Sequence, residues 1–214
     1  ELLFEASVGG GIPIIRPLQE DFLANQISSI RAIINGTTNF ILTEMASGGM
    51  DYQAALKHAQ KLGYAERDPS DDVTGIDAAY KLSILASLAF HTRIHFDDVY
   101  HEGIENLEAH DFLYADELGF SIKLLAIAKK ESDGIQIRVH PALVPQDKLL
   151  AKVDGPYNAI EITGDLLGPV TFHGIGAGSL PTTSSLAADL LRIAKKIRDK
   201  ARPPSRQHLY KKLE

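Results

Sequence analysis

The segment from Gly63 to Lys81 constrains the fold most, because it places five carboxylates and a lysine at the start of a long apolar run. Gly63 fits the position just past a helix end, and Pro69 disfavours a helical conformation in the residue before it. The apolar pattern resumes at Val73, which is typical of a new helix. The segment therefore predicts a loop that leads into a buried helix, with the carboxylates near the helix N-terminus.

Asp77 and Lys81 are four residues apart and share one face of that helix. An exposed pair with this spacing is common and contributes only about 0.3–0.5 kcal/mol. However, residues 82–90 are apolar on nearly every side, which is typical of a helix inside a core. Lysines are seldom buried without a partner. We interpret the pair as a general acid/base rather than a surface ion pair.

The composition fits a single globular domain. The chain has 214 residues, of which 44% are apolar, and this is enough to bury a full core. We expect one domain over residues 1–200 and a basic, proline-containing tail over residues 201–214. The net charge of -6 and the scattered lysines and arginines argue against nucleic acid as a partner.

The sequence gives no sign of a membrane or of disulfide chemistry. No apolar run reaches the roughly 18 residues that cross a bilayer, and no signal segment marks the first residues. We therefore expect a cytoplasmic protein without a membrane partner. The absence of cysteine excludes disulfides, thiolate metal sites and cysteine nucleophiles. The chain starts at Glu1 without Met, and we expect it to be part of a longer protein.

Hydrophobic periodicity predicts a mixed set of elements, with strands concentrated in the second half. Strands are expected over residues 2–6, 27–34, 99–104, 120–129, 135–139, 159–163 and 169–172, and helices over residues 51–62, 73–91, 108–118 and 186–200. Ser132-Asp133-Gly134 predicts a hairpin. Thr37 or Thr38 is expected to cap a helix that continues to about Ser47.

Two glycine-rich turns are candidates for ligand contact. Residues 9–11 allow positive φ angles, and residues 174–178 lead towards the last helix and form an anion-friendly corner. Neither turn fits the dinucleotide or Walker fingerprint, so each is weak evidence alone. For Asn35 and Thr37, a turn and a helix cap are favoured over a role in a site.

Three separated motifs resemble the substrate-binding and catalytic domain of homoserine dehydrogenase. They are EASVGGGIPII at residues 5–15, NGTTNFIL at 35–42 and GYAERDPSDDVTGIDAAYK at 63–81. The glycine turn at 174–178 and the PTTSS run at 181–185 are similar too. The resemblance covers residues 1–194, and its long third motif is specific.

The resemblance implies an NAD(P)-dependent interconversion of L-homoserine and L-aspartate 4-semialdehyde, on the route to threonine, methionine and isoleucine. Lys81 matches the family's acid/base lysine, and Asp77 matches its carboxylate partner. Glu66 matches the residue that binds the substrate ammonium, and Asp72 matches a further substrate contact. This agrees with the chemistry expected of the lysine, since an ammonium can protonate a developing alkoxide.

The resemblance also implies ion and cofactor contacts. A sodium ion would be held by the Glu5 side chain and by the main-chain carbonyls of Val8, Gly10 and Ile12. The loop of Gly176, Ala177 and Gly178 would approach NAD or NADP, which would be bound mainly by a nucleotide-binding domain that these residues do not include. The fragment is therefore expected to be inactive alone.

The expected fold is α+β, a mixed and largely antiparallel sheet with helices packed on one face. The resemblance further implies a homodimer or higher homo-oligomer. Two alternatives remain open. The chain could be a non-catalytic oligomerisation or binding module that keeps the pocket, or belong to another semialdehyde or hydroxy-acid dehydrogenase with a similar lysine pair.

Overall fold

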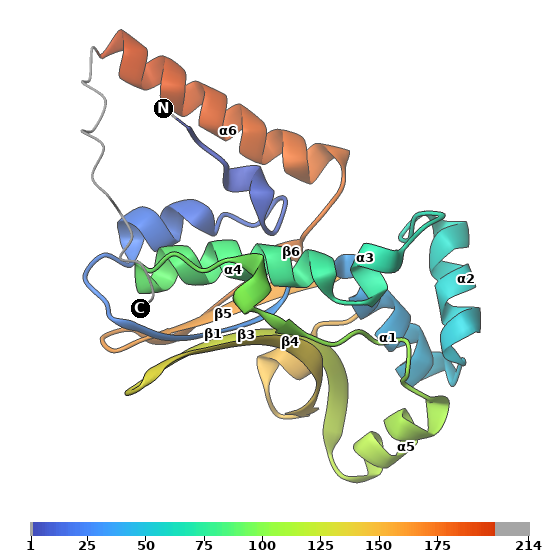
Figure 1. Cartoon of the computed structure of the whole chain (residues 1–214). Helices are drawn as coiled ribbons and strands as arrows, with labels where there is room; N and C mark the ends of the chain where they lie inside the picture. Colours follow the sequence, from blue (N-terminus) through green and yellow to red (C-terminus); the bar gives the residue numbers. More distant parts are fainter. Residues whose placement is uncertain (1, 200–214) are drawn as a thin grey trace.

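The computed structural model describes residues 2–199, and its six strands form one sheet (Figure 1). The strand order is β2-β4-β3-β1-β5-β6, and every pair is antiparallel except β2 with β4. The strands are β1 (Ile27–Ile33), β2 (Tyr100–His101), β3 (Phe120–Glu131), β4 (Gly134–Pro145), β5 (Tyr157–Gly164) and β6 (Gly168–Ile175). The mixed, largely antiparallel sheet is confirmed. The tail expected over residues 201–214 lies outside the described residues.

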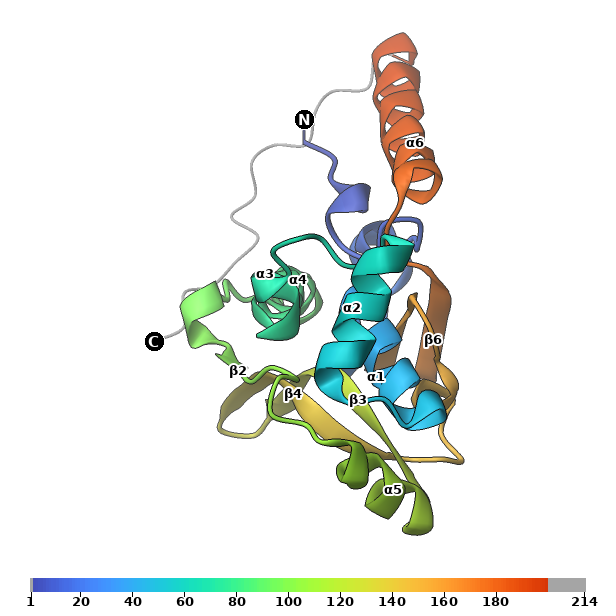
Figure 2. The ribbon, with the colours of Figure 1, turned by 90° about the vertical axis from the view of Figure 1, so that its right-hand side faces the viewer.

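Helices accompany the sheet mainly in the first half of the chain (Figures 1 and 2). The α-helices are α1 (Gly36–Gly48), α2 (Tyr52–Leu62), α3 (Ser70–Val73), α4 (Ile76–Phe90), α5 (Ala109–Glu117) and α6 (Ser179–Arg198). Shorter helical turns are η1 (Glu5–Ser7), η2 (Pro17–Asp21), η3 (Phe96–Asp98) and η4 (Leu149–Lys152). Most elements therefore match the periodicity, including the helix that ends next to His91.

The core lies between α4 and one face of the sheet. Along β1, Ile30 and Ala32 belong to the same buried cluster as Leu82 of α4, which has no exposed surface. Because side chains alternate along a strand, Ile33 points to the opposite face, where it packs with Leu150 of η4. Helix α4 thus covers one face, as expected, and a small helical turn covers part of the other.

The hairpin expected at Ser132-Asp133-Gly134 is present. It joins β3 to β4, whose register pairs Glu131 with Gly134 at the turn. The strand expected over residues 99–104 is reduced to the two residues of β2, which pair in parallel with Arg138 and Val139 of β4.

The strand expected over residues 2–6 is wrong. Glu5 lies in η1, and its side chain turns back to the residues that begin the next helical segment. Its Oε1 accepts the amides of Ile14 and Ile15 at 2.7 and 2.8 Å, and its Oε2 accepts the amide of Arg16 at 3.0 Å. The buried carboxylate therefore fixes a compact loop, and these residues do not join the sheet.

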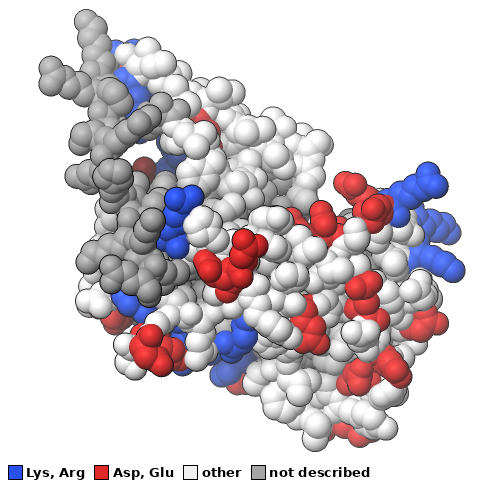
Figure 3. Space-filling model, viewed as in Figure 1, with Lys and Arg blue, Asp and Glu red and all other residues white. Residues whose placement is uncertain are grey.

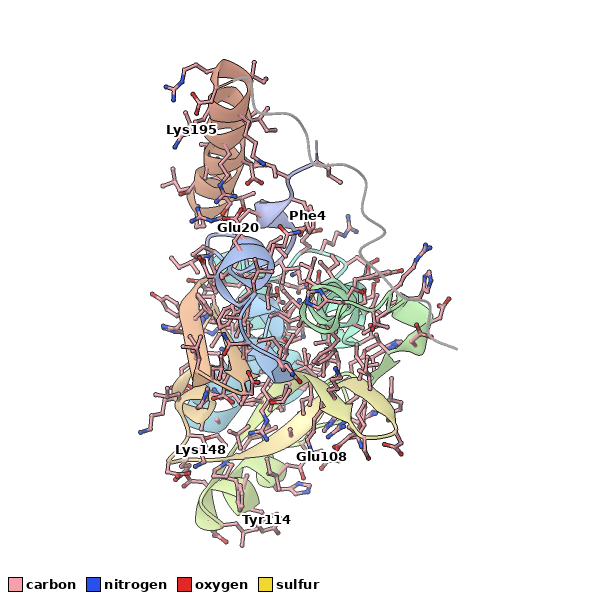
Figure 4. All side chains as sticks on the ribbon, turned by 90° about the vertical axis from the view of Figure 1, so that its left-hand side faces the viewer. Phe4, Glu20, Glu108, Tyr114, Lys148 and Lys195 are labelled. Atoms are coloured by element: carbon pink, nitrogen blue, oxygen red, sulfur yellow. The ribbon has the colours of Figure 1, made fainter. Side chains whose placement is uncertain are left out.

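Helix α6 begins at Ser179, seven residues before the start predicted at Leu186. Pro181 lies in its first turn, where the missing N–H costs nothing. The helix stands away from the sheet, with the segments that carry Phe4 and Glu20 between them (Figure 4). It is held by the Ser185 hydroxyl, which donates to the Gly10 carbonyl at 2.7 Å, and by Asp189, which accepts the Glu5 amide at 2.9 Å.

Charged side chains of both signs are scattered over the face of the molecule in Figure 3. On the face in Figure 3, the acidic side chains lie mostly over the right-hand half, and Lys and Arg form no continuous stripe across it. Within residues 2–199, every helix is too short or too polar to cross a membrane.

Asn39 ties α1 to the loop before β5, and we expect Asn39→Ala to destabilise the domain. Its buried Nδ2 donates to the carbonyls of Val153, Gly155 and Tyr157 at 3.0, 2.9 and 3.1 Å. Leaving these carbonyls without a donor should lower the free energy of unfolding by about 2–3 kcal/mol, measured by urea denaturation. Gln53→Ala, an exposed change on α2, is the control and should shift it by less than about 0.5 kcal/mol. If the two substitutions lowered the free energy of unfolding equally, Asn39 would not have the structural role that we assign to it.

Candidate functional site

A cleft of about 480 Å³ opens where the N-terminus of α1, the start of α4 and the end of β6 meet. Figure 2 faces the side of the molecule where α1, α2 and β6 lie. The predicted residues that line the cleft are Asp72, Asp77, Lys81, Gly176, Ala177 and Gly178. Segments separated by about half the chain therefore meet in one place.

Lys81 and Asp77 are in direct contact at the edge of this cleft. The Lys81 Nζ donates to Asp77 Oδ2 at 2.7 Å and to the Ile34 carbonyl at 3.2 Å. The two side chains are 23% and 30% exposed, so the pair is neither fully buried nor freely solvated. The buried residues that follow on α4 hold the lysine at the boundary of the core. Two of its three N–H donors are used, which leaves one for a ligand oxygen.

Asn35 connects this pair to a second carboxylate. Its Nδ2 donates to Asp77 Oδ2 at 2.9 Å and to Asp72 Oδ1 at 2.6 Å. Its Oδ1 accepts the Thr38 amide at 2.9 Å, which makes Asn35 the N-cap of α1. Since a carbonyl oxygen must accept that amide, the amino group is fixed towards the two aspartates.

The cap assigned to Thr37 or Thr38 is therefore wrong, because Asn35 already accepts the free amide. The Thr37 hydroxyl instead donates to the carbonyl of Tyr64 at 2.7 Å and joins α1 to the loop after α2. Asn35 was expected to form a turn and a cap, and in the structure the same side chain also lines the cleft.

The network from Lys81 through Asp77 and Asn35 to Asp72 carries opposite charges at its two ends. The Lys81 ammonium can donate to an electron-rich oxygen of a ligand, and the Asp72 carboxylate can accept from a cationic group. A small polar molecule with an oxygen at one end and a cationic group at the other matches this distribution of charge. The site therefore fits a small amino-acid-like ligand.

Glu66 lies outside the cleft lining. Its side chain is exposed, and its carbonyl accepts a hydrogen bond from Gln60 at 3.0 Å. Its predicted contact with a substrate ammonium remains a prediction. Asp68, further along the same loop, is fully exposed, and hydrogen bonds from Ser70 lower the pKa of its carboxyl. We interpret Asp68 as a residue that shapes the turn before α3.

The predicted sodium ligands lie in the loop beside α6. The Glu5 carboxylate already accepts three amides, and the Gly10 carbonyl accepts the Ser185 hydroxyl. Val8 and Ile12 are buried. Between residues 2 and 199 there is no group of three or more His, Asp or Glu side chains that would hold a metal ion. The geometry gives Glu5 a structural role, and the sodium site stays a prediction.

Sequence reasoning missed Asn158 at the start of β5. This residue lines the cleft and is 1% exposed. Its only signal in the sequence is that an asparagine precedes the alternating run at residues 159–163, where a strand would favour a larger or β-branched residue.

The fold is that of an α+β domain, and its cleft contains a lysine and aspartate pair in direct contact. A family model described as homoserine dehydrogenase matches residues 13–191, and the chain belongs to this family. It is 53% identical over 196 residues to a homoserine dehydrogenase from Synechocystis sp., covering 90% of this chain and 45% of the relative. The chain spans about half the length of the curated relatives that it matches.

Solved structures agree with this assignment. A homoserine dehydrogenase from Thiobacillus denitrificans superposes with a TM-score of 0.91 at 49% identity, covering 94% of this chain and 47% of that one. A hyperthermophilic archaeal homoserine dehydrogenase in complex with NADPH has a TM-score of 0.77 at 34% identity, covering 91% of this chain and 56% of that one.

The position of Asn35 between two carboxylates predicts a pH-dependent effect of substitution. Asn35→Asp and Asn35→Ser both keep a good helix cap, but only the first adds a third carboxylate. At pH 7 we expect Asn35→Asp to be less stable than Asn35→Ser by about 1–3 kcal/mol, since like charges crowd a partly buried site. Protonation relieves the repulsion, so the difference should shrink at pH 4.5. Urea unfolding at both pH values measures it, and equal stability of the two variants at pH 7 would show that the carboxylates are not crowded.

Proposed function

We propose that this chain is the substrate-binding and acid/base part of an NAD(P)-dependent homoserine dehydrogenase. The reaction is the interconversion of L-homoserine and L-aspartate 4-semialdehyde, in amino-acid biosynthesis that leads to threonine, methionine and isoleucine. The observation that carries the proposal is the network of Lys81, Asp77, Asn35 and Asp72 in one cleft. Family membership supports the reaction type. We further propose a cytoplasmic homo-oligomer, with a homodimer as the simplest form.

Lys81 acts as the proton donor when the semialdehyde is reduced. NADPH, when bound, would supply a hydride to the aldehyde carbon. The free N–H of Lys81 protonates the carbonyl oxygen, on which negative charge develops as the aldehyde is reduced. In the reverse direction, the neutral amine of Lys81 removes the hydroxyl proton of homoserine. Asp77 holds the amine in place and stabilises its charged form through the 2.7 Å contact.

The acidic side chains bind the other end of the substrate. Asp72 lines the cleft, and Asn35 holds its carboxylate next to Asp77. We assign Asp72 and Glu66 to the substrate ammonium, with Glu66 reaching the ligand from the edge of the cleft. A neutral amide between two carboxylates is suited to this task, because it keeps them together without cancelling the charge that attracts a cation.

The loop of Gly176, Ala177 and Gly178 supplies the cofactor side of the cleft. Ala177 and Gly178 are exposed at the cleft, and Gly178 has a φ of 120°, which favours glycine. The NADPH complex of an archaeal relative supports the choice of cofactor. Since the chain spans about half the length of its relatives, we propose that the other half binds most of the dinucleotide. No step is assigned to sodium at Glu5, Val8, Gly10 and Ile12.

The first test is proton transfer by Lys81. In the protein at the full length of its relatives, Lys81→Met should lower kcat for homoserine oxidation by about 10²–10⁴-fold. Lys81→Arg keeps the positive charge but does not release a proton near neutral pH, so it should not restore the rate. The control is Lys61→Met on the exposed side of α2, which should leave kcat unchanged. A Lys81→Met enzyme with more than about half of normal kcat would refute the proposed role.

The second test separates a catalytic domain from a non-catalytic binding or oligomerisation module. Isothermal titration of L-homoserine into this chain should show specific binding that Glu66→Ala weakens by about tenfold or more, because a charge-assisted contact is lost. Intact oligomers without homoserine binding would favour the module. The 214 residues alone should not oxidise homoserine with NADP, and turnover at the rate of a full-length relative would contradict our division of the active site.

A further inference from the structure

Asn158 has a buried side chain that makes no hydrogen bond within the described residues. Its exposure is 1%, and its Oδ1 has no partner among residues 2–199. No hydrogen bond of its Nδ2 is found in that part of the chain either. Buried amides are normally paired, because removing them from water without compensation costs stability. An unpaired amide that lines a cleft is therefore explained best by a ligand.

Asn39 shows what a structural asparagine looks like in this fold. It is as buried as Asn158, and its Oδ1 likewise has no partner among residues 2–199, but its Nδ2 donates to three backbone carbonyls and so joins α1 to the loop before β5. Asn158 lies next to that loop and makes none of these bonds. The difference indicates that Asn158 is not needed to connect elements.

Gly176 makes room for the Asn158 amide, because a Cβ at Gly176 would overlap this side chain. A Cβ at Gly36 would be in ordinary contact with the Asn158 Oδ1, at 3.6 Å. The amide thus lies between the cofactor loop and the N-terminus of α1. This places it on the wall of the cleft that also contains Lys81.

We propose that Asn158 binds the carboxamide of the nicotinamide ring, an inference that rests on the proposed function. The Oδ1 accepts an N–H of the carboxamide, and the Nδ2 donates to its carbonyl oxygen. A primary carboxamide is the group that satisfies both atoms of Asn158 at once, whereas a substrate ammonium would satisfy only Oδ1. The ammonium also has better acceptors in Asp72 and Glu66, the two carboxylates that we assign to it. Asn158 would thereby fix which edge of the ring faces Lys81.

The binding test uses the protein at the full length of its relatives and two cofactors. We expect Asn158→Ala to weaken NADPH binding by about tenfold, measured by the fluorescence of the reduced ring. The second cofactor is the reduced 3-acetylpyridine analogue, in which a methyl group replaces the carboxamide NH2. For it, the same substitution should weaken binding by no more than about threefold, since one of the two hydrogen bonds is already missing.

Three results would overturn the inference. If Asn158→Ala weakened the binding of both cofactors equally, Asn158 would not recognise the carboxamide NH2. Unchanged NADPH binding with about tenfold weaker homoserine binding would assign Asn158 to the substrate ammonium. If Asn158→Ala changed the binding of neither cofactor nor substrate, Asn158 would not belong to the site. In that case the proposed function would still stand, provided that the wild-type enzyme oxidises homoserine. A wild type without turnover would instead contradict the proposed function.

A stability measurement on this chain gives an independent readout. Asn158→Leu replaces an unpaired amide with an apolar group of similar size, so its thermal midpoint without cofactor should equal or exceed that of the wild type. The matched change Asn39→Leu should lower the midpoint by several degrees, because three carbonyls lose their donor. If Asn158→Leu lowered the midpoint as much as Asn39→Leu, the amide would be structural, and the inference would be wrong.

Discussion

The hydrogen bonds of Asn35 are the interaction on which the rest of the site depends. One end of the side chain caps α1, and the other end holds Asp72 and Asp77 together. A cap is a local requirement of the helix, whereas the bridge joins Asn35 to two carboxylates about 40 residues later in the sequence. Because both tasks use one planar amide, the direction of α1 and the positions of the two carboxylates are fixed together.

The central strand delivers these groups to the cleft. Strand β1 pairs with β3 and β5, so its end is among the best supported backbone in the sheet. The residues that follow it are Ile34, whose carbonyl accepts Lys81, and Asn35, whose amide reaches the aspartates. On the opposite side, the buried face of α4 holds Lys81 and Asp77. The acid/base pair is therefore supported by two rigid elements, which limits the movement of the reacting nitrogen.

Local sequence signals predicted the parts of this arrangement that depend on neighbours in the chain. The hairpin between β3 and β4 follows from its turn residues, and the contact of Asp77 with Lys81 follows from their spacing on α4. The apolar run after Lys81 likewise predicted a helix that packs on the sheet. For the hairpin and the ion pair the relevant partner is within a few residues, and for α4 the periodicity of its own residues predicts the helix, so periodicity and turn chemistry are sufficient.

The parts that escaped prediction depend on distant partners. The run at residues 2–6 resembles a strand, but the carboxylate of Glu5 binds amides nine to eleven residues later, and this holds the chain in a loop. The start of α6 was missed because Pro181 and the polar residues after it resemble a loop, although a proline is tolerated in a first helical turn. Asn35 has a clear local role as a cap, and its second role appears only when α3 and α4 are in place.

Buried polar side chains near the cleft support the loop that leads to it. Asn39 and Lys123 are buried and donate to groups of the chain itself, with Lys123 donating to the Val153 carbonyl at 2.7 Å and to the Asp154 carboxylate at 2.9 Å. These bonds fasten the loop before β5 to the sheet and to α1. Asn158, a few residues further along the same loop and strand, is held in a defined position by this support while its own amide makes no bond. A polar group that is fixed by its neighbours but left unpaired loses little freedom when a ligand binds, because its orientation is already set. The hydrogen bonds donated by Asn39 and Lys123 thus support the segment that holds the unpaired amide of Asn158 in the cleft.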